Sequence, residues 1–584
     1  MNQPKTNRSR TVLILILFFV SGALALTYQV VWSRMMMHIF GSTAIAVGTV
    51  LAAFMTGLAI GSLKIGPYAD RSPNRLRLYA WLEFAIAATA LLSHLLLSLI
   101  NPTQEALFSL IGSSSSNFGL IRFLMAFLLV LMPTVLMGAT LPVLTSYLVQ
   151  SRESVGVKLS TLYSVNTFGA VTGVLLTGFV LIGAYGIHVP VYMAVFGNLV
   201  IGFIAWLMSG RVRRPSPDAA PAFESGGGES NTGVADSSPM MLRVILFGLA
   251  LSGFTSFAYE IYWTRSLVFI LGNSTYALTT MLSAFLTGIA LGGYLIRFFI
   301  RRTRDGFALF GWIQVLLGVV SALALPLLFA VSDPQSMSRY VLESSGTVST
   351  YILTGFGIAF LVMLVPAILI GATFPLAGHL GVADVDRTGT KIGRIYAINT
   401  AGNVLGALLP GIFLLNWLGI QKGIVTMAVL NALLGFTILF MRLMPSPRHP
   451  AWRMVMPLLV ALTALTMSRA PIQFQFPTEG ESDTHHTLFY REGPSATTKV
   501  TYDTRSKNKN MSVDGIVIGG TGTVDFKQLL LAHLPKLLLK DVSKELSIGI
   551  GSGIMMGESL LHPGVEKIIA VEIEPGVVEG AATF

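Results

Sequence analysis

Apolar segments dominate this chain and decide what it can fold into. Runs long enough to cross about 30 Å of hydrocarbon recur through residues 11–441, and short loops between them hold most of the basic residues. Hydrophobic residues make up 53% of the chain and charged residues only 11%, which is unlike a soluble domain. The sequence therefore predicts a polytopic α-helical protein with twelve spans, embedded in the lipid bilayer of the cell membrane.

Basic residues gather in alternate loops between these runs. The positive-inside rule therefore predicts a cytoplasmic N-terminus. The basic loops account for the net charge of +11, so this charge does not indicate a nucleic-acid partner. The absence of cysteine excludes disulfides and thiolate chemistry. No metal site is expected either, because the spacing of His485, His486, His533 and His562 is not that of metal ligands.

An internal repeat organises the membrane part. The stretch SGALALTYQVVWSR, which begins at Ser21, returns without a gap as SGFTSFAYEIYWTR, which begins at Ser252. Further on, LYSVNTFGAVTG returns as IYAINTAGNVLG. The sequence thus predicts two six-helix repeats, at 1–210 and 241–445, joined by a disordered cytoplasmic linker at 211–240 that is rich in Pro, Gly and Ser. Since six is even, the repeats are parallel, and the plan resembles that of major facilitator transporters.

A loop after the second span strengthens this resemblance. GPYADRSPNR carries Gly66, Asp70, Arg71 and Arg75 in the order of the major facilitator signature. The corresponding loop of the second repeat is degenerate, with Arg297 in place of the first glycine. Pairs of glycines four residues apart, in both repeats, are expected to let helices pack closely.

Polar side chains inside hydrocarbon are costly and so mark candidate transport residues. Glu260, beside Tyr259, could bind a cationic amine or a proton; alternatively, it forms an ion pair with Arg265, one to two turns further on. Asn166 and Asn399 occupy equivalent places in the two repeats. They either belong to a transport path or form hydrogen bonds between helices.

The pattern changes after residue 445. The segment 446–470 is a tether or a thirteenth helix, because its apolar run 454–468 is only marginally long enough to span, and this leaves open which side of the membrane holds the tail. Residues 471–584 first show short strands, which predict a small β-unit. An amphipathic helix (DFKQLLLAHLPKLLL) and a strand–turn–helix–strand unit follow, which is the start of a Rossmann-like α/β domain.

Three glycines form the turn of that unit. Gly549, Gly551 and Gly553 allow a tight turn and close approach of a ligand to the backbone. Glu572 ends the next strand about 20 residues later, where a carboxylate can accept both hydroxyls of a ribose. Because the turn lacks the dinucleotide spacing, S-adenosylmethionine or a relative is the expected ligand. We expect the neighbouring Glu574 to be solvated.

The tail resembles a known enzyme family. Residues 514–584 are similar to spermidine synthases, the polyamine aminopropyltransferases, through VDG, LLLAHLP, IGIGSG, HPGVEKI and VEIEPGVVE. The whole chain resembles membrane-fused spermidine synthase-like proteins. By this resemblance, Gly549, Gly551 and Glu572 would contact decarboxylated S-adenosylmethionine, and Gln528 stands where the family often places a donor-contacting residue. The implied reaction is aminopropyl transfer from this donor to an amine such as putrescine.

Departures from the family keep other functions open. Ile518, Lys527 and Ser552 replace a Gln, a Tyr and an Asp of soluble spermidine synthases. The family's catalytic Asp is expected beyond Phe584, so we expect a truncated domain that is inactive alone. One alternative is a transporter of polyamines or another small solute with a vestigial or sensory tail. Another is an S-adenosylmethionine-dependent methyltransferase, since the same turn and carboxylate would serve the intact donor.

Overall fold

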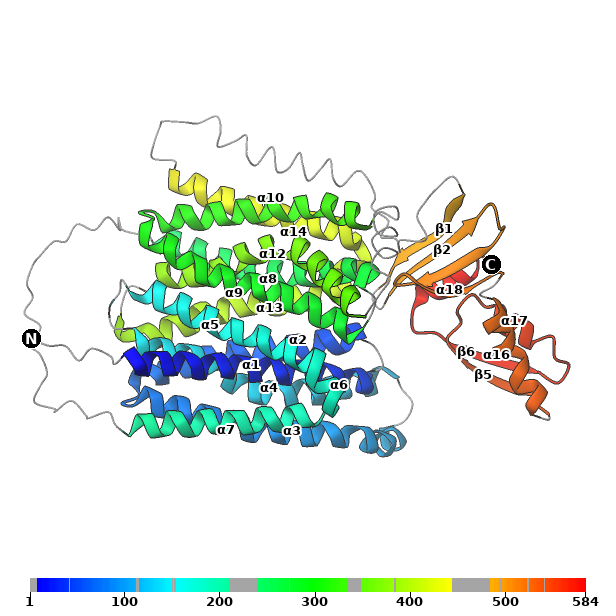
Figure 1. The fold of residues 1–584 in the computed structure, drawn as a ribbon, viewed down its shortest axis with the longest axis horizontal. Helices are drawn as coiled ribbons and strands as arrows, with labels where there is room; N and C mark the ends of the chain where they lie inside the picture. Colours follow the sequence, from blue (N-terminus) through cyan, green and yellow to red (C-terminus); the bar gives the residue numbers. More distant parts are fainter. Residues whose placement is uncertain are drawn as a thin grey trace, which may run out of the picture.

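The computed structural model describes residues 8–40, 43–111, 115–149, 151, 154–210, 239–271, 274–332, 348–382, 385–443, 484–493, 496–522, 525–539 and 541–584. Long helices lie side by side in a bundle, and a small α/β region sits at one end of it (Figure 1). The predicted tether at 446–470 lies outside the described residues, as does nearly all of the predicted linker.

Long apolar helices form both halves of the bundle. In the first half they are α1 (Arg8–Phe40), α2 (Thr43–Arg71), α3 (Arg75–Ile111), α4 (Ser115–Leu148), α5 (Val155–Leu175) with its extensions η2 (Leu176–Leu181) and α6 (Ile182–Tyr185), and α7 (Val189–Ser209). In the second half they are α8 (Pro239–Leu271), α9 (Thr275–Arg302), α10 (Gly306–Ser332), α12 (Val348–Gly381), α13 (Thr388–Leu409) with η3 (Val385–Arg387) before it and η4 (Pro410–Leu414) after it, and α14 (Leu415–Leu443).

The predicted number of spans needs a correction. Within the described ranges, 11 helices are long and apolar enough to cross a membrane, where the sequence predicts twelve. The helix that falls short is α13. It carries Lys391, Arg394 and Asn399, and these polar residues lower its mean hydropathy.

The helices of the two halves pair in the same way. In the first half α1 packs on α5, α2 on α4 and α3 on α7; in the second, α8 packs on α13, α9 on α12 and α10 on α14. The halves meet mainly where α5 packs on α9 and α2 packs on α13, with smaller contacts of α4 with α13 and α5 with α12. The polar helix α13 therefore occupies the place in its half that α5 occupies in the other.

The duplication extends to irregularities of the backbone. A π-helical segment follows α5 as η2 and follows α13 as η4. Each is followed by a glycine with positive φ, +74° at Gly186 and +66° at Gly419. Other residues are strained at such angles, so glycine makes the sharp corner before α7 in the first half and the break within α14 in the second half.

Close helix contacts confirm the packing role of paired glycines. A Cβ atom at Gly61 of α2 would lie 1.7 Å from the carbonyl oxygen of Val135 in α4. The equivalent Gly292 of α9 would place it 1.9 Å from the carbonyl oxygen of Ile368 in α12. No side chain fits at these distances, and the helix backbones touch directly.

The C-terminal region has two small sheets. The strands β1 (His485–Glu492), β2 (Thr497–Asp503), β3 (Lys509–Val513) and β4 (Ile516–Gly520) form an antiparallel sheet in sequence order. The strands β5 (Lys544–Ile548) and β6 (Lys567–Val571) pair in parallel. The helices are α16 (Asp525–Leu538), α17 (Ile554–Ser559) between the parallel strands, and α18 (Pro575–Ala581). The order predicted from the sequence, a β-unit followed by a mixed α/β unit, is confirmed.

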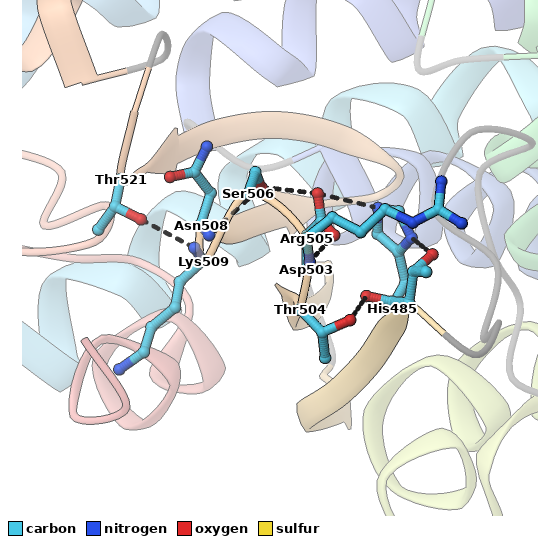
Figure 2. Close-up of polar contacts among 9 residues, drawn as sticks. His485, Asp503, Thr504, Arg505, Ser506, Asn508, Lys509 and Thr521 are labelled. Carbon is cyan, nitrogen blue, oxygen red and sulfur yellow. Dashed lines mark hydrogen bonds and ion pairs between the residues drawn. The ribbon is translucent and has the colours of Figure 1, made fainter.

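The turn between β2 and β3 is held by polar contacts (Figure 2). One carboxylate oxygen of Asp503 accepts from the Ser506 hydroxyl at 2.6 Å, and the other accepts from the Arg505 N–H at 2.9 Å. These hydrogen bonds lower the pKa of Asp503. Ser506 itself is exposed at the tip of the turn.

Candidate functional site

The glycine turn after β5 has a backbone that only glycine adopts readily. Its φ angles are +94° at Gly549, +57° at Gly551 and +82° at Gly553. A Cβ atom at any of the three would meet no atom within 4 Å. The glycines are therefore required by conformation rather than by crowding, and the space beside the turn is open to a ligand.

Glu572 lies against this turn, as the sequence predicts. One oxygen of its carboxylate accepts from the Ile550 N–H of the turn at 2.9 Å, and the other accepts from the Ile573 and Glu574 N–H groups at 2.8 and 3.1 Å. A carboxylate has about four acceptor positions, so capacity remains for the hydroxyls of a ribose. The three backbone donors fix the orientation of the side chain.

Gln528 of α16 reaches the same turn. Its side-chain oxygen accepts from the Ser552 hydroxyl at 2.6 Å. Its Nε2 is buried and makes no hydrogen bond to any described residue. A Cβ atom on Gly519 of β4 would lie 2.7 Å from that nitrogen, so a glycine is needed there. A buried donor without a partner is costly, and a ligand acceptor at this point would satisfy it.

The three residues that differ from soluble spermidine synthases lie in different environments. Ser552 is buried and is the hydrogen-bond partner of Gln528. Ile518 and Lys527 are exposed. Only Ser552 therefore touches the candidate site directly.

Glu574 is not solvated, and that expectation was wrong. It is 2% exposed and accepts from the Gly576 N–H at the start of α18 and from the Ala496 N–H at 3.1 Å. The first N–H groups of a helix have no partner within the helix, and a carboxylate at the N-cap satisfies them. The second contact comes from a residue 78 positions away, which the local pattern does not reveal.

His533 and His562 are also brought together. Their ring nitrogens lie 2.8 Å apart, and Glu558 lies 3.3 Å from His533. Among the described residues, no group of three or more side chains is arranged to hold a metal ion.

A second cluster joins the α/β region to the bundle. Glu492, at the end of β1, accepts from the Ile420 N–H of α14 at 2.6 Å and from the Tyr490 hydroxyl at 2.8 Å. The guanidinium of Arg265 in α8 donates to the carbonyl oxygen of Gly493 at 2.8 Å. Burial raises the pKa of Glu492, and the hydrogen bonds and the charge of Arg265 oppose this.

Asp514 belongs to the same cluster. Its carboxylate accepts from the Thr497 N–H at 2.9 Å. Burial raises its pKa as well, and the positive charge of Arg265 again acts in the opposite direction. Arg265, which the sequence suggested as a partner of Glu260, thus faces two carboxylates of the C-terminal region. Glu260 itself is half-buried in α8.

The other candidates within the bundle make contacts between helices. Tyr259 is buried, stacks on Trp263 with ring centroids 4.9 Å apart, and accepts from the Asn431 amide at 3.3 Å. Asn166 donates to the carbonyl oxygen of Phe18 in α1 at 3.0 Å. Asn399 lies against Gly253 of α8. The hydrogen bond between helices that the sequence suggested is present at Asn166.

Sequence reasoning missed a buried carboxylate in the first half. Glu83 of α3 is 0% exposed and accepts from the Ser21 hydroxyl at 2.8 Å and the Asn198 amide at 2.6 Å. Tyr28 donates to the same Asn198 at 2.8 Å. The signal was an acidic residue within the apolar run WLEFAIAATALL. The aligned second repeat reads WIQV, with Gln314 in the equivalent position.

Asp70 of the signature loop contacts the other half. Its carboxylate accepts from the N–H groups of Gly389 and Thr390, both at 2.7 Å, and from the Thr390 hydroxyl at 2.6 Å. It therefore caps the N-terminus of α13, where an anion also complements the helix dipole. The two halves are tied at this end of the bundle.

Comparison with curated proteins connects the tail to one enzyme. The polyamine aminopropyltransferase of Sodalis glossinidius (strain morsitans) is 33% identical over 99 residues, 17% of this chain and 34% of that protein. That of Serratia proteamaculans (strain 568) is 34% identical over 92 residues, 16% of this chain and 32% of that protein. A longer match, to the enzyme of Corynebacterium efficiens, is 24% identical and covers 60% of this chain and 64% of that protein. The chain thus spans about a third of the length of the first two relatives. No family model matches it.

Two solved transporter structures are similar to this chain at low sequence identity. The major facilitator superfamily transporter FucP in its outward conformation has a TM-score of 0.47 at 14% identity, over 74% of this chain and 98% of that one. The human organic anion transporter MFSD10 has a TM-score of 0.47 at 14% identity, over 74% of this chain and 100% of that one. The chain thus combines a multi-pass membrane region with partial homology to polyamine aminopropyltransferases over its C-terminal part.

Proposed function

We propose that this chain is a membrane-anchored, spermidine synthase-like protein whose tail binds decarboxylated S-adenosylmethionine. The carrying observation is the contact between the Glu572 carboxylate and the glycine turn, at the edge of open space. On this proposal the parts are two six-helix repeats at 1–210 and 241–445, and a Rossmann-like unit within 471–584. The homology to aminopropyltransferases supports the choice of donor.

Each residue of the turn has a defined task in this proposal. Glu572 accepts hydrogen bonds from the ribose hydroxyls, and the backbone around Gly551 approaches the donor closely. The free Nε2 of Gln528 donates to an acceptor on the donor molecule. In the reaction that the homology suggests, an amine attacks the carbon beside the sulfonium and the thioether leaves. We assign no general base among the described residues.

Donor binding by the full-length protein in lipid nanodiscs tests the proposal. We expect Glu572→Gln to weaken the affinity for decarboxylated S-adenosylmethionine at least tenfold, because a carboxylate that accepts from two hydroxyls becomes an amide. Gly551→Ala should do the same through strain at its φ of +57°. The matched control is Glu566→Gln, an exposed carboxylate before β6. Equal affinity in all four proteins would contradict the proposal.

Competition between donors separates aminopropyl transfer from methyl transfer. The glycine turn and Glu572 would hold intact S-adenosylmethionine equally well. Titration of both donors against the unsubstituted chain should show tighter binding of the decarboxylated form. A preference for the carboxylated form would favour the methyltransferase alternative.

Transport is the second candidate function, and the contact of Asp70 with α13 favours it. This contact ties the two halves at one end of the bundle, as a closed gate would. We propose a small cationic amine as solute and Glu260 as the residue that binds it or a proton. Glu260→Gln should abolish uptake of radiolabelled putrescine at unchanged protein level. Unchanged uptake would exclude this role of Glu260.

A further inference from the structure

We propose that the C-terminal α/β region is docked on the face of the membrane opposite the N-terminus, so that its substrates reach it from outside the cytoplasm. The inference deepens the proposed function and rests on it for the nature of the substrates. The placement of the region does not depend on donor binding. It rests on the contacts of Arg265, Glu492 and Asp514 and on the distribution of basic loops.

The contacts between the α/β region and the helix bundle involve charged side chains and backbone groups on both sides. The Glu492 carboxylate accepts from the Ile420 N–H, and the Arg265 guanidinium donates to the Gly493 carbonyl. Asp514 is 7% exposed and also feels the charge of Arg265. Ile420 directly follows the Gly419 corner, so Glu492 satisfies a backbone donor at the start of the last helix. Removing this partner would leave that donor buried and unsatisfied.

These contacts lie at one identifiable end of the bundle. Arg265 is in the last two turns of α8, and Ile420 directly follows the break at Gly419 near the start of α14. The start of α1, in dark blue, lies at the other end of the bundle (Figure 1). The last span runs from the docked end toward Leu443, and 23 further residues at 1.5 Å each place its end about 35 Å away.

The chain therefore leaves the bundle at one end and re-enters the described structure at the other. The helix α14 ends on the side of the bundle where α1 starts, and the docked region, which begins with β1, lies at the opposite end (Figure 1). A chain with ends on both sides of a bilayer crosses that bilayer between them. The segment between these two ends, 444–483, lies outside the described residues, and its sequence contains the apolar run 454–468.

The distribution of basic loops identifies the two faces. It places the N-terminus in the cytoplasm, and the docked region consequently outside it. A sulfonium nucleoside carries a fixed positive charge and does not cross hydrocarbon unaided. The donor must therefore be exported, or be carried across by this bundle, before it meets the glycine turn.

Cysteine labelling tests this placement directly because the chain has no cysteine. Ser506→Cys puts a thiol at the exposed β2–β3 turn (Figure 2), and Ser543→Cys gives a second exposed site before β5. Ser230→Cys lies in the sequence segment between the two halves, which the positive-inside rule predicts to be cytoplasmic. Each full-length variant is exposed to a membrane-impermeant maleimide in intact cells and again after permeabilisation.

We expect both tail sites to be labelled in intact cells, and the 230 site only after permeabilisation. Labelling of all three sites under the same condition would overturn the proposal, because the two regions would share a face. Labelling of the 230 site alone in intact cells would overturn the external location. The result does not depend on donor binding, so loss of the proposed function would leave the labelling pattern unchanged.

Discussion

Two buried acidic side chains, Glu83 and Glu574, and the half-buried Glu492 each accept hydrogen bonds from several donors. Glu83 is held by a hydroxyl and an amide, Glu574 by backbone N–H groups, and Glu492 by a backbone N–H and a phenol. Burying a carboxylate without such partners costs several kcal/mol, on the order of the whole stability of a domain. Each of these residues is consequently a point at which substitution is informative.

At position 83, substitution of the glutamate by glutamine should destabilise the protein less than substitution by alanine. Glu83→Gln keeps the volume and one acceptor, so we expect the free energy of unfolding to fall by about 1 kcal/mol. Glu83→Ala leaves Ser21 and Asn198 without an acceptor and should cost about 3 kcal/mol. Thermal unfolding in detergent compares the variants. Equal losses would show that packing, rather than hydrogen bonding, decides the effect.

Glu492 and Asp514 should make the docked region more stable at lower pH. Burial raises both pKa values above those of the unfolded chain, so the folded state binds these protons more tightly. Their contribution is fully present below the unfolded pKa and is lost as pH rises through the folded pKa. Asp503 has a lowered pKa, so its contribution to stability is instead lost as the pH falls through its folded pKa, at more acidic pH.

Limited proteolysis of the tail checks this pH dependence. Cleavage should be slower at pH 5 than at pH 7.5, after correction for protease activity on an unfolded substrate. In Glu492→Gln the dependence should weaken, because one of the two carboxyls no longer titrates. A tail that is cleaved faster at pH 5 would contradict the predicted sign.

At the scale of elements, the cap on α13 by Asp70 links the two halves of the bundle. Asp70→Ala removes the acceptor for the Gly389 and Thr390 N–H groups and should lower the free energy of unfolding by about 1–2 kcal/mol. Arg71→Ala, at the exposed neighbouring position, is the matched control. Identical melting curves for the two variants would show that the cap contributes nothing measurable.

Direct backbone contact between α9 and α12 leaves no room for a side chain. Gly292→Val would push a branched side chain against the carbonyl oxygen of Ile368 and should cost at least about 1–3 kcal/mol. Gly357→Ala in α12, where a Cβ atom meets nothing within 4 Å, should be nearly neutral. Purification yield and thermal unfolding distinguish the two. A stable Gly292→Val protein would show that the helices can separate without loss.

Across the whole molecule, the sequence predicts what depends on local pattern and on the repeat. The apolar runs, the duplication and the order of the tail follow from periodicity within short windows. The position of Glu572 beside the glycine turn follows from the strand–turn–helix–strand pattern. These features needed no knowledge of distant contacts.

Contacts between distant segments could not be predicted in the same way. Glu574 was misjudged because its burial depends on Ala496, in the turn between two earlier strands. The sequence suggested an ion pair between Arg265 and Glu260 of the same helix, but the Arg265 guanidinium donates a hydrogen bond to the carbonyl oxygen of Gly493, which is 228 residues away. The sequence of α13 matches that of α5 in the other repeat, so α13 was counted as a span although its mean hydropathy is too low. In each case a tertiary contact or a sum over a whole helix decided the outcome.

Gly186 and Gly419 occupy similar positions in the two halves and both have positive φ. Within the described residues, the α/β region contacts the backbone next to Gly419, through the hydrogen bond from the Ile420 N–H to Glu492. The contacts described here run to α8 and α14, which belong to one half of the bundle. If the two halves move relative to each other, as the proposed transport would require, the α/β region moves with the second half. The distance between the glycine turn and the first half would then change, which would couple the proposed solute transport to the proposed donor binding.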